Sequence, residues 1–356
     1  MSTHKNFQPL LIWLIKRNDT LDQIVFLFIS KKNATNARHI PLFTESKNVR
    51  VVYLNGASIK YFDRLLLTLS KKLFSVQKKK LKKYKILHVM DYKPIISGIT
   101  HVIHIDDPIY TLEELSKLLK WEEKIFELKG KSIIVVTNLY SKDWYLKSLK
   151  HSKIYIIEQG FHEIKSKTKH LTNELIFAYS SNYIHYGSDL HGDHSTWSAN
   201  LLLDTIIPRI MSLNPSVKFY LIGELGRNAK KNIYTNPNIV SFGRVNYEEN
   251  MEILSRCTVA LYPRTFDHFR SVLKIFTYIG AELPIVTFDL IDTEIVSKKE
   301  LGITVNDVDS FVLAATELIN SPKKLEFYRN NIKGLGGEFS WSNLAHKMNF
   351  YLTPYV

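Results

Sequence analysis

Short apolar runs alternate with longer amphipathic stretches along almost the whole chain of 356 residues. In the first half the apolar runs predict strands at residues 24–29, 51–54, 85–89, 101–105, 132–137 and 153–157. Stretches with helical spacing lie between them, at residues 61–83, 111–128 and 141–149. Strands that alternate with helices are typical of parallel sheets with crossover connections. The pattern therefore predicts an α/β protein.

The alternation begins afresh in the second half of the chain. Strands are expected at residues 175–179, 217–222, 239–242, 258–262 and 284–288, and helices at 196–213, 247–256, 272–279, 308–319 and 323–335. The polar, aperiodic stretch 162–172 is the expected linker. Because this length suits two domains of roughly 150 to 180 residues, we expect an N-terminal domain at 1–165 and a C-terminal domain at 166–340. A last helix within 341–356 is expected to return to the first domain.

Positive charge is concentrated in the first half. Residues 1–165 hold 29 Lys and Arg against 15 Asp and Glu, and so carry the whole formal excess of +14. Its densest part runs from Lys71 to Lys85, where eight lysines are interleaved with apolar residues. Such a segment suits an anionic membrane surface, at about 1 kcal/mol per lysine, or nucleic-acid phosphates. It is equally compatible with a solvated lysine-rich face.

The single cysteine and the N-terminal sequence bear on the compartment. Cys257 alone can form neither an intrachain disulfide nor a thiolate metal cage, which fits a reducing environment. The apolar run at residues 9–15 is short, and Lys16 and Arg17 follow it. No stretch approaches the roughly 18 to 20 apolar residues that span a bilayer. We therefore expect a cytoplasmic protein, free or peripheral on the inner membrane face.

Two segments of the second half place candidate chemistry at strand ends. In the first, a strand runs into Gly243, and Asn246 is placed to cap the helix that follows. The apolar strand after it ends at Pro263, and the next helix starts near Ser271, so that Lys274 lies one turn into it. Ligands bind at the carboxyl ends of parallel strands, where a helix N-terminus offers free N–H groups to a phosphate. Lys274 would add a full positive charge there.

These segments resemble the donor-binding half of GT-B glycosyltransferases, in particular the branch with xanthan-type glucuronosyltransferases and teichuronic acid glycosyltransferases. The matching residues are Gly243, Val245, Tyr247, Glu248 and Glu249, and then Val272, Leu273, Lys274, Thr277, Tyr278, Pro284, Ile285 and Val286. The resemblance covers residues 175–345 well and the first half loosely. It implies two Rossmann-like domains that face each other across a cleft. It also implies sugar transfer from a nucleoside diphosphate sugar, with a UDP-sugar as the expected donor, to a glycan or lipid-linked glycan acceptor.

The resemblance also assigns donor contacts. Lys274 would bind the diphosphate beside backbone amides near Ser271, and the same helix carries the further candidates Thr277 and Tyr278. In this branch a proline stands at the position of Val272, and an acidic or amide residue stands at the position of Thr277. A carboxylate contact is therefore lost, although the Thr277 hydroxyl could still donate a hydrogen bond to ribose or phosphate.

Other donor contacts are expected at neighbouring strand ends. The backbone around Arg244 and Val245 would read the base, and Gly223 and Glu224 would line the cleft. The loop after the first strand of this half lacks the usual Arg or Lys. That loop therefore offers only the candidates Ser180, Ser181 and His185.

Two carboxylates in the first half are candidates for the catalytic base. Asp106 and Asp107 follow the apolar run 101–105, where a strand is expected to end. An inverting transfer needs a carboxylate that takes the proton of the acceptor hydroxyl, and the resemblance matches Asp106 to that role. The alternative is an Asp-Asp-Pro turn that only ends the strand. The E-x7-E arrangement of many retaining GT-B enzymes is absent, which favours inversion.

No cofactor or divalent metal is expected, because Lys274 and helix amides would stabilise the leaving diphosphate. Two other functions remain open. A metal-dependent hydrolase could use either of two His/Asp clusters, although neither has the spacing of a helical H-E-x-x-H site. These clusters are His101, His104, Asp106 and Asp107, and His185, Asp189, His191, Asp193 and His194. A basic nucleic-acid-binding protein would fit the charge, but no known nucleic-acid motif accompanies it and no such partner is expected.

A short segment before the linker resembles the turn that joins the two domains of this family. It runs from Glu158 to His162, and Gly160 is expected to let the backbone bend there.

Overall fold

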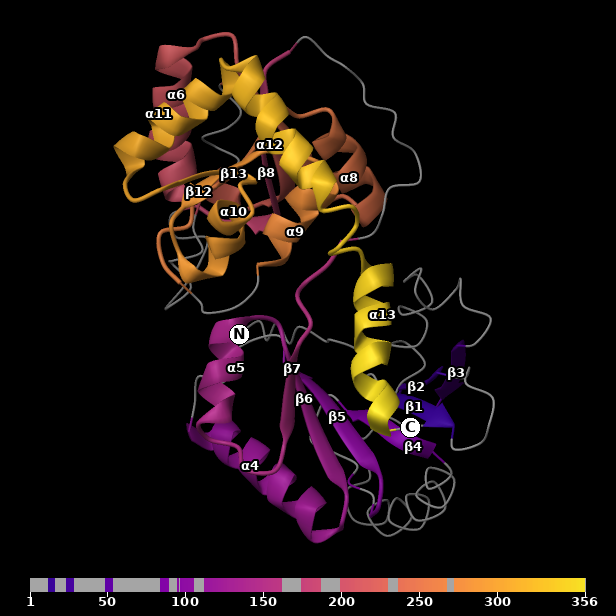
Figure 1. Cartoon of the computed structure of the whole chain (residues 1–356). Helices are drawn as coiled ribbons and strands as arrows, with labels where there is room; N and C mark the ends of the chain where they lie inside the picture. Colours follow the sequence, from indigo (N-terminus) through magenta and orange to yellow (C-terminus); the bar gives the residue numbers. More distant parts are fainter. Residues whose placement is uncertain are drawn as a thin grey trace. The chain divides into compact units, whose positions relative to one another are not determined.

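The computed structural model describes part of the chain (Figure 1). The described residues are 12–16, 24–28, 49–53, 84–89, 95, 97–105, 112–161, 174–186, 199–229, 236–267 and 272–355. Residues 1–158 with 345–356 form one compact unit, here unit 1, and residues 159–344 form a second, here unit 2. The expected helix at 61–83 with its lysines and the expected linker at 162–172 lie outside the described residues.

Unit 1 contains a seven-stranded sheet in the order β3-β2-β1-β4-β5-β6-β7. Its strands are β1 (Ile12–Lys16), β2 (Ile24–Phe28), β3 (Val49–Tyr53), β4 (Tyr84–Val89), β5 (Thr100–Ile105), β6 (Lys131–Val136) and β7 (Lys153–Ile156). Strand β1 is antiparallel to both of its neighbours, and the other pairs are parallel. The sequence pattern did not predict β1, which overlaps the short apolar run at residues 9–15.

Two helices of unit 1 cover the parallel part of this sheet, α4 (Leu112–Glu127) and α5 (Leu139–Leu146). Helix α4 buries Leu118, Trp121 and Ile125 in a core cluster that also contains residues of β5 and β6. The Glu122 carboxylate is buried too, and it accepts hydrogen bonds from the backbone N–H groups of residues 150, 151 and 152. This carboxylate fixes the turn into β7, because the buried group accepts from three backbone donors at once.

His101 lies on β5 and is fully buried. Its Nδ1 lies 3.0 Å from the Ile99 carbonyl oxygen, which can only accept, so Nδ1 carries the proton. Burial lowers the pKa of this imidazole from 6.5 to about 4, and the bond to Ile99 raises it in part. The sequence placed His101 in a candidate metal cluster, whereas the structure shows a neutral histidine inside the sheet.

Acid is expected to destabilise the protein through His101. Below pH 6.5 the unfolded chain binds a proton that the folded chain does not, so this stability is complete above pH 6.5 and is lost as the pH falls toward 4. The loss should reach about 2 kcal/mol between pH 7 and pH 5. Urea unfolding at both pH values measures it, and the variant His101→Gln, which can donate to Ile99 without titrating, is the control. Equal pH dependence in the two proteins would contradict the assignment.

Unit 2 contains a six-stranded, wholly parallel sheet in the order β10-β9-β8-β11-β12-β13. Its strands are β8 (Ile176–Ile184), β9 (Lys218–Leu225), β10 (Ile239–Gly243), β11 (Val259–Tyr262), β12 (Ile285–Phe288) and β13 (Gly302–Val305). Numbered along the chain, this order is 3-2-1-4-5-6, that of doubly wound nucleotide-binding folds. The order reverses between β8 and β11. The sequence pattern missed β13, a run of only four residues.

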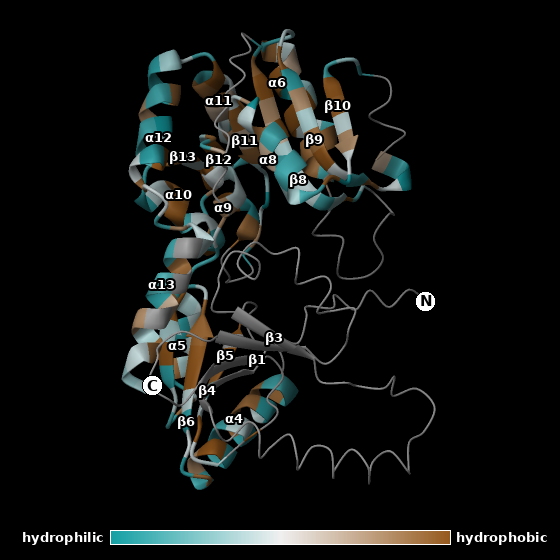
Figure 2. Ribbon diagram, turned by 90° about the vertical axis from the view of Figure 1, so that its right-hand side faces the viewer, coloured by the Kyte–Doolittle hydropathy of each residue, from teal (hydrophilic) through white to brown (hydrophobic). Residues whose placement is uncertain are grey.

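Helices cover both faces of this sheet, and strands such as β9 and β10 carry mostly hydrophobic residues (Figure 2). The helical elements are the π-helical turn η3 (Leu201–Ile206), α6 (Ile207–Leu213), α8 (Tyr247–Ser255), α9 (Leu273–Gly280), the 3-10 turn η4 (Ile291–Thr293), α10 (Glu294–Lys298), α11 (Val308–Ile319) and α12 (Pro322–Gly334). One core cluster contains residues of η3, α6 and α11, and the other contains residues of α8 and α9. The N-cap predicted at Asn246 is confirmed, with Glu249 completing a capping box.

Helix α13 (Trp341–Leu352) contains the point where the chain passes back from unit 2 to unit 1. Just before it, Phe161 and Ser340 form a parallel bridge. Gly160 has no left-handed backbone, and its role is a close approach: a Cβ atom there would lie 2.8 Å from the Phe339 carbonyl oxygen and 2.6 Å from Leu344 Cδ1. The structure thus adds a packing requirement at Gly160, and the backbone bend expected there stays a prediction. Among the described helices, none is long and apolar enough to cross a membrane.

Candidate active site

The carboxyl ends of β8 and β11 define the candidate site in unit 2. The strand order reverses between these two neighbours, and ligands of doubly wound sheets bind at the carboxyl ends of the strands at that point. Strand β8 brings Tyr179 and Ser180 there, β11 brings Tyr262, and α9 begins after β11 and brings Lys274. Segments that are up to 95 residues apart in the sequence therefore meet at one edge of the sheet.

Lys274 is held beside two tyrosine rings. Its Nζ lies 5.3 Å from the centroid of the Tyr179 ring and 5.9 Å from that of the Tyr262 ring. Both distances are within the range of cation–π attraction. The side chain is half-buried, and Val272, the N-cap of α9, supplies no side-chain hydrogen bond to the start of the helix. The site thus combines an oriented ammonium group with a helix N-terminus, the combination that favours a phosphate.

Tyr278 supports the middle of β8, just past its pairing with β11. Its ring is fully buried, and its hydroxyl oxygen accepts a hydrogen bond of 2.9 Å from the Ser180 backbone N–H. The Ser180 hydroxyl in turn donates to Asn250 Oδ1 at 2.9 Å. Burial raises the pKa of the Tyr278 hydroxyl, so it stays protonated at neutral pH. Ser180 and Tyr278, both expected to bind the donor, thus form a chain of hydrogen bonds that joins α8, β8 and α9.

Thr277 is nearly buried, and its hydroxyl donates a hydrogen bond of 3.0 Å to the Leu273 carbonyl one turn earlier in α9. A hydroxyl group has one proton to donate and two lone pairs that accept. A contact between Thr277 and the nucleotide sugar therefore requires the hydroxyl oxygen to accept a hydrogen bond, or the hydrogen bond to Leu273 to break. The hydrogen bond to ribose or phosphate expected from the sequence stays a prediction.

Gly223 ends the regular part of β9 beside an irregularity in β8. The register between the two strands shifts between Ser180 and Tyr183. At Gly223 φ is +144°, and a Cβ atom there would lie 1.9 Å from the Ser181 carbonyl oxygen. Only glycine fits this position, both for the backbone conformation and for the space. The residue shapes the edge of the site through its backbone.

Replacing Gly223 with alanine is expected to destabilise unit 2 by about 3 kcal/mol, because the new methyl group collides with backbone and the backbone becomes strained. Thermal unfolding followed by circular dichroism measures the effect. Gly243→Ala is the matched control: φ is +66° there, but no heavy atom lies within 4 Å of the added Cβ. That variant should lose only about 1 kcal/mol. An equal loss in both variants would rule out the close approach as the cause.

The remaining predicted contacts lie at the ends of β9 and β10. Glu224 is exposed and pairs in register with Tyr183 of β8. Arg244 is exposed, and its guanidinium lies 5.8 Å from the Tyr183 ring centroid, with Nη1 3.5 Å from the Tyr183 hydroxyl. Val245 is half-buried against the core cluster of α8 and α9. The sequence did not single out Tyr183, which places an exposed aromatic ring beside Arg244.

Several predicted residues fall in stretches that the structure does not describe. Asp106, Asp107 and Ser271 lie outside the described residues, as do Asp189, His191, Asp193 and His194 of the second metal cluster. Among the residues that the structure does describe, no group of three or more His, Cys, Asp or Glu side chains could hold a metal ion. Cys257 is buried, and burial raises the pKa of its thiol to about 12.

The sequence of this chain matches neither a family model nor a curated protein. Its structure, however, is similar to solved glycosyltransferases. One from Rickettsia africae ESF-5 has a TM-score of 0.61 at 12% identity, over 92% of this chain and 89% of that one. WaaG, a glycosyltransferase involved in lipopolysaccharide biosynthesis, has a TM-score of 0.52 at 11% identity, over 85% and 87%.

A third similar structure contains ligands. The pneumococcal O-GlcNAc transferase GtfA, solved in complex with UDP and GlcNAc, has a TM-score of 0.51 at 12% identity, over 80% of this chain and 60% of that one. At such identities the likeness establishes the fold. The fold is GT-B, an α/β architecture with two Rossmann-like domains, and the fold class predicted from the sequence is confirmed.

Proposed function

We propose that this protein is a glycosyltransferase that moves a sugar from a nucleoside diphosphate sugar to a glycan or lipid-linked glycan acceptor. The observation that carries the proposal is the position of Lys274, which lies at the start of α9 beside the strand ends where the sheet order reverses. The GT-B fold supports the proposal, since the similar structures include glycosyltransferases. UDP is the first candidate for the nucleotide, because the GtfA structure contains UDP.

The chemistry follows from the charges of the site. As the bond between the sugar and the diphosphate breaks, negative charge develops on the leaving phosphate oxygen. Lys274 and the N–H groups at the start of α9 would stabilise this charge, a role that a divalent metal plays in other glycosyltransferases. Asp106 would take the proton of the acceptor hydroxyl as that oxygen attacks the sugar carbon. Such a direct displacement would invert the configuration at that carbon.

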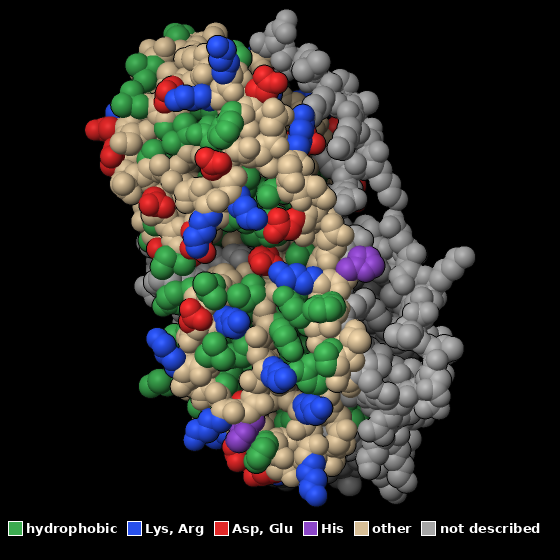
Figure 3. Space-filling view, in the orientation of Figure 1, with side chains coloured by type: hydrophobic (Ala, Val, Ile, Leu, Met, Phe, Trp, Pro, Cys, Tyr) green, Lys and Arg blue, Asp and Glu red, His purple; other side chains and the backbone are tan. Residues whose placement is uncertain are grey.

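The field around Lys274 is local. Residues 166–356 hold 19 basic and 19 acidic residues, and Figure 3 shows side chains of both signs interspersed on the visible face of unit 2. A broad basic surface therefore does not explain donor binding. The lysine-rich segment from Lys71 to Lys85 is a separate candidate, for contact with an anionic membrane that carries a lipid-linked acceptor. The xanthan and teichuronic acid branch, a cytoplasmic location and a peripheral place at the inner membrane face belong to this proposal.

A panel of UDP-, GDP-, CMP- and dTDP-linked sugars tests the function. A ligand that binds only the folded protein raises its melting temperature, so one nucleotide class should raise it and the others should not. The same donor should be hydrolysed slowly, or transferred to an acceptor, in the presence of EDTA. If no nucleotide sugar shifts the melting temperature, the proposed function is wrong. If activity requires a divalent ion, the metal-free mechanism is wrong.

A further inference from the structure

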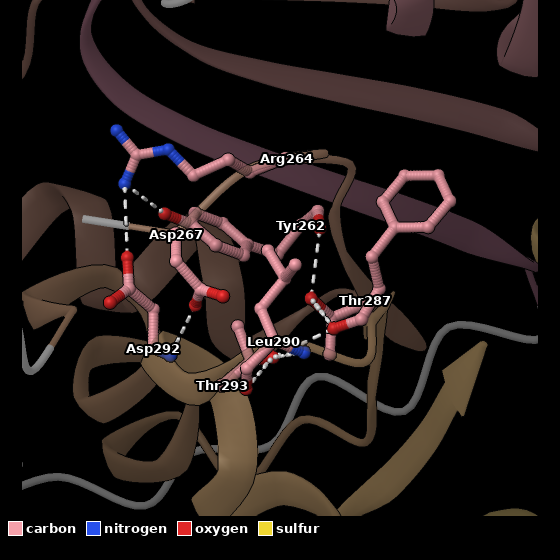
Figure 4. Close-up of polar contacts among 8 residues, drawn as sticks. Tyr262, Arg264, Asp267, Thr287, Leu290, Asp292 and Thr293 are labelled. Carbon is pink, nitrogen blue, oxygen red and sulfur yellow. Dashed lines mark hydrogen bonds and ion pairs between the residues drawn. The ribbon is translucent and has the colours of Figure 1, made fainter. Parts of the chain in front are cut away.

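Arg264 and Asp292 form a buried ion pair at the edge of the candidate site (Figure 4). Arg264 follows β11, and its backbone N–H donates to the Tyr262 carbonyl at 3.0 Å, which turns the chain back toward the strand end. Its Nη1 donates to the Tyr262 hydroxyl at 3.1 Å and lies 3.8 Å from Asp292 Oδ2. The guanidinium is thus placed at the carboxyl end of β11, next to the point where the sheet order reverses.

Further hydrogen bonds fix the partner of Arg264. Asp292 belongs to η4, and its backbone N–H donates to Asp267 Oδ1 at 3.0 Å. Thr287 of β12 donates through its hydroxyl to the Tyr262 carbonyl at 3.0 Å, and the hydroxyl of Thr293 donates to the Phe288 carbonyl at 2.7 Å. These bonds join the ends of β11 and β12 with η4, so the position of the pair is defined by two neighbouring strands.

Stability alone gives little reason for this pair. The side chains of Arg264 and Asp292 are 8% and 0% exposed, whereas Arg209 and Asp309, an Arg–Asp pair on α6 and α11, are 44% and 77% exposed. Burying two charges costs several kcal/mol, and an apolar pair of similar volume is often as stable or more stable. Functional sites commonly retain buried charged groups for their chemistry.

Tyr262 connects Arg264 with Lys274. Arg264 donates to the hydroxyl of this tyrosine, and Lys274 Nζ lies 5.9 Å from the centroid of the same ring. The charge of Arg264 also reaches Tyr179, the other ring beside Lys274. Burial raises the pKa of the Tyr179 hydroxyl, and a hydrogen bond with Ser181 and then the charge of Arg264 lower it in part. Lys274 and Arg264 therefore reach the same strand end through Tyr262. Asp292 balances one of the two positive charges, and a bound anion would balance the other.

The second half of β8 and the residues that follow it offer no cation. Residues 179–195 include neither Lys nor Arg, and a diphosphate carries more negative charge than one lysine neutralises. Arg264 reaches the same edge of the sheet from β11. A guanidinium has five N–H donors in a planar fork that suits phosphate oxygens.

We propose that Arg264 is the second cation of the donor site, where it binds the diphosphate of the nucleotide together with Lys274, and that Asp292 positions its guanidinium. The inference rests on the proposed function, because it concerns the same ligand. It assigns the β11 end, rather than the loop after β8, to recognition of the second phosphate.

The test compares a nucleoside diphosphate with its monophosphate. UDP, GDP, CDP and dTDP are first titrated into the wild-type protein by calorimetry, and the tightest of them is kept together with its monophosphate. Arg264→Gln should weaken binding of the diphosphate about tenfold or more, because charge-assisted bonds are lost, and binding of the monophosphate less than threefold. The diphosphate affinity of Arg264→Lys should lie between those of the wild-type protein and Arg264→Gln. The control Arg209→Gln should leave both affinities unchanged.

The ratio of the diphosphate affinity to the monophosphate affinity decides the outcome, because a purely structural role would lower both affinities together. An unchanged ratio in Arg264→Gln overturns the inference. If that variant does not fold, as judged by circular dichroism, Arg264→Lys decides: it should lower the ratio at least threefold, and a wild-type ratio overturns the inference. A wild-type protein that binds none of the nucleoside diphosphates contradicts the proposed function itself, which is a different result from tight binding that Arg264 does not affect.

Discussion

Replacing Lys274 with alanine is expected to weaken binding of the nucleoside diphosphate about 100-fold, because one charge-assisted contact to phosphate is lost. The ammonium lies beside the rings of Tyr179 and Tyr262, so it is already oriented before the donor arrives. Alanine has the highest helix propensity, and the second residue of α9 tolerates it. The loss should therefore concern the ligand and leave the fold intact. Isothermal titration calorimetry measures the affinity.

Lys298→Ala is the matched control for Lys274→Ala. Lys298 lies on α10 of the same unit, is exposed, and pairs with Glu294 at 2.7 Å. This variant removes the same charge from the unit, so it should keep the wild-type affinity if the field at Lys274 is local. Equal losses in both variants would show that the net charge of unit 2 matters, and that Lys274 has no specific contact.

Replacing Asp106 with asparagine is expected to lower turnover by a factor of about 100 to 10,000, the usual contribution of a general base, and to leave donor affinity near normal. Asparagine keeps the size of the side chain but cannot accept the proton of the acceptor hydroxyl. Initial rates with saturating donor, together with the dissociation constant of the diphosphate, separate the two effects. Asp107→Asn is the control, because the neighbouring carboxylate should contribute little to turnover.

The opposite result is informative for both aspartates. A large loss in Asp107→Asn alone would move the base by one residue. Full activity in both aspartate variants, combined with unchanged donor affinity in Lys274→Ala, would show that the roles assigned to this site are wrong.

Local sequence determined the class of fold and several features of the site. The alternation of apolar runs and amphipathic stretches indicated an α/β protein, since each element buries its own face at its own period. The cap at Asn246 was predictable because it needs only Glu249, three residues away. The position of Lys274 within the first turn of a helix after a strand is equally local. All of these depend on residues within one or two turns of each other.

Tertiary structure alone decided which residues meet. Nothing near Arg264 in the sequence indicates Asp292, 28 residues later, and nothing near Lys274 indicates Tyr179. The requirement for Gly223 comes from the Ser181 carbonyl on the neighbouring strand. These contacts depend on the order and register of parallel strands, which are set by long-range packing of short apolar segments that resemble one another. The sequence thus determined the elements and the candidate lysine, and the sheet order determined the tyrosines and the arginine that surround it.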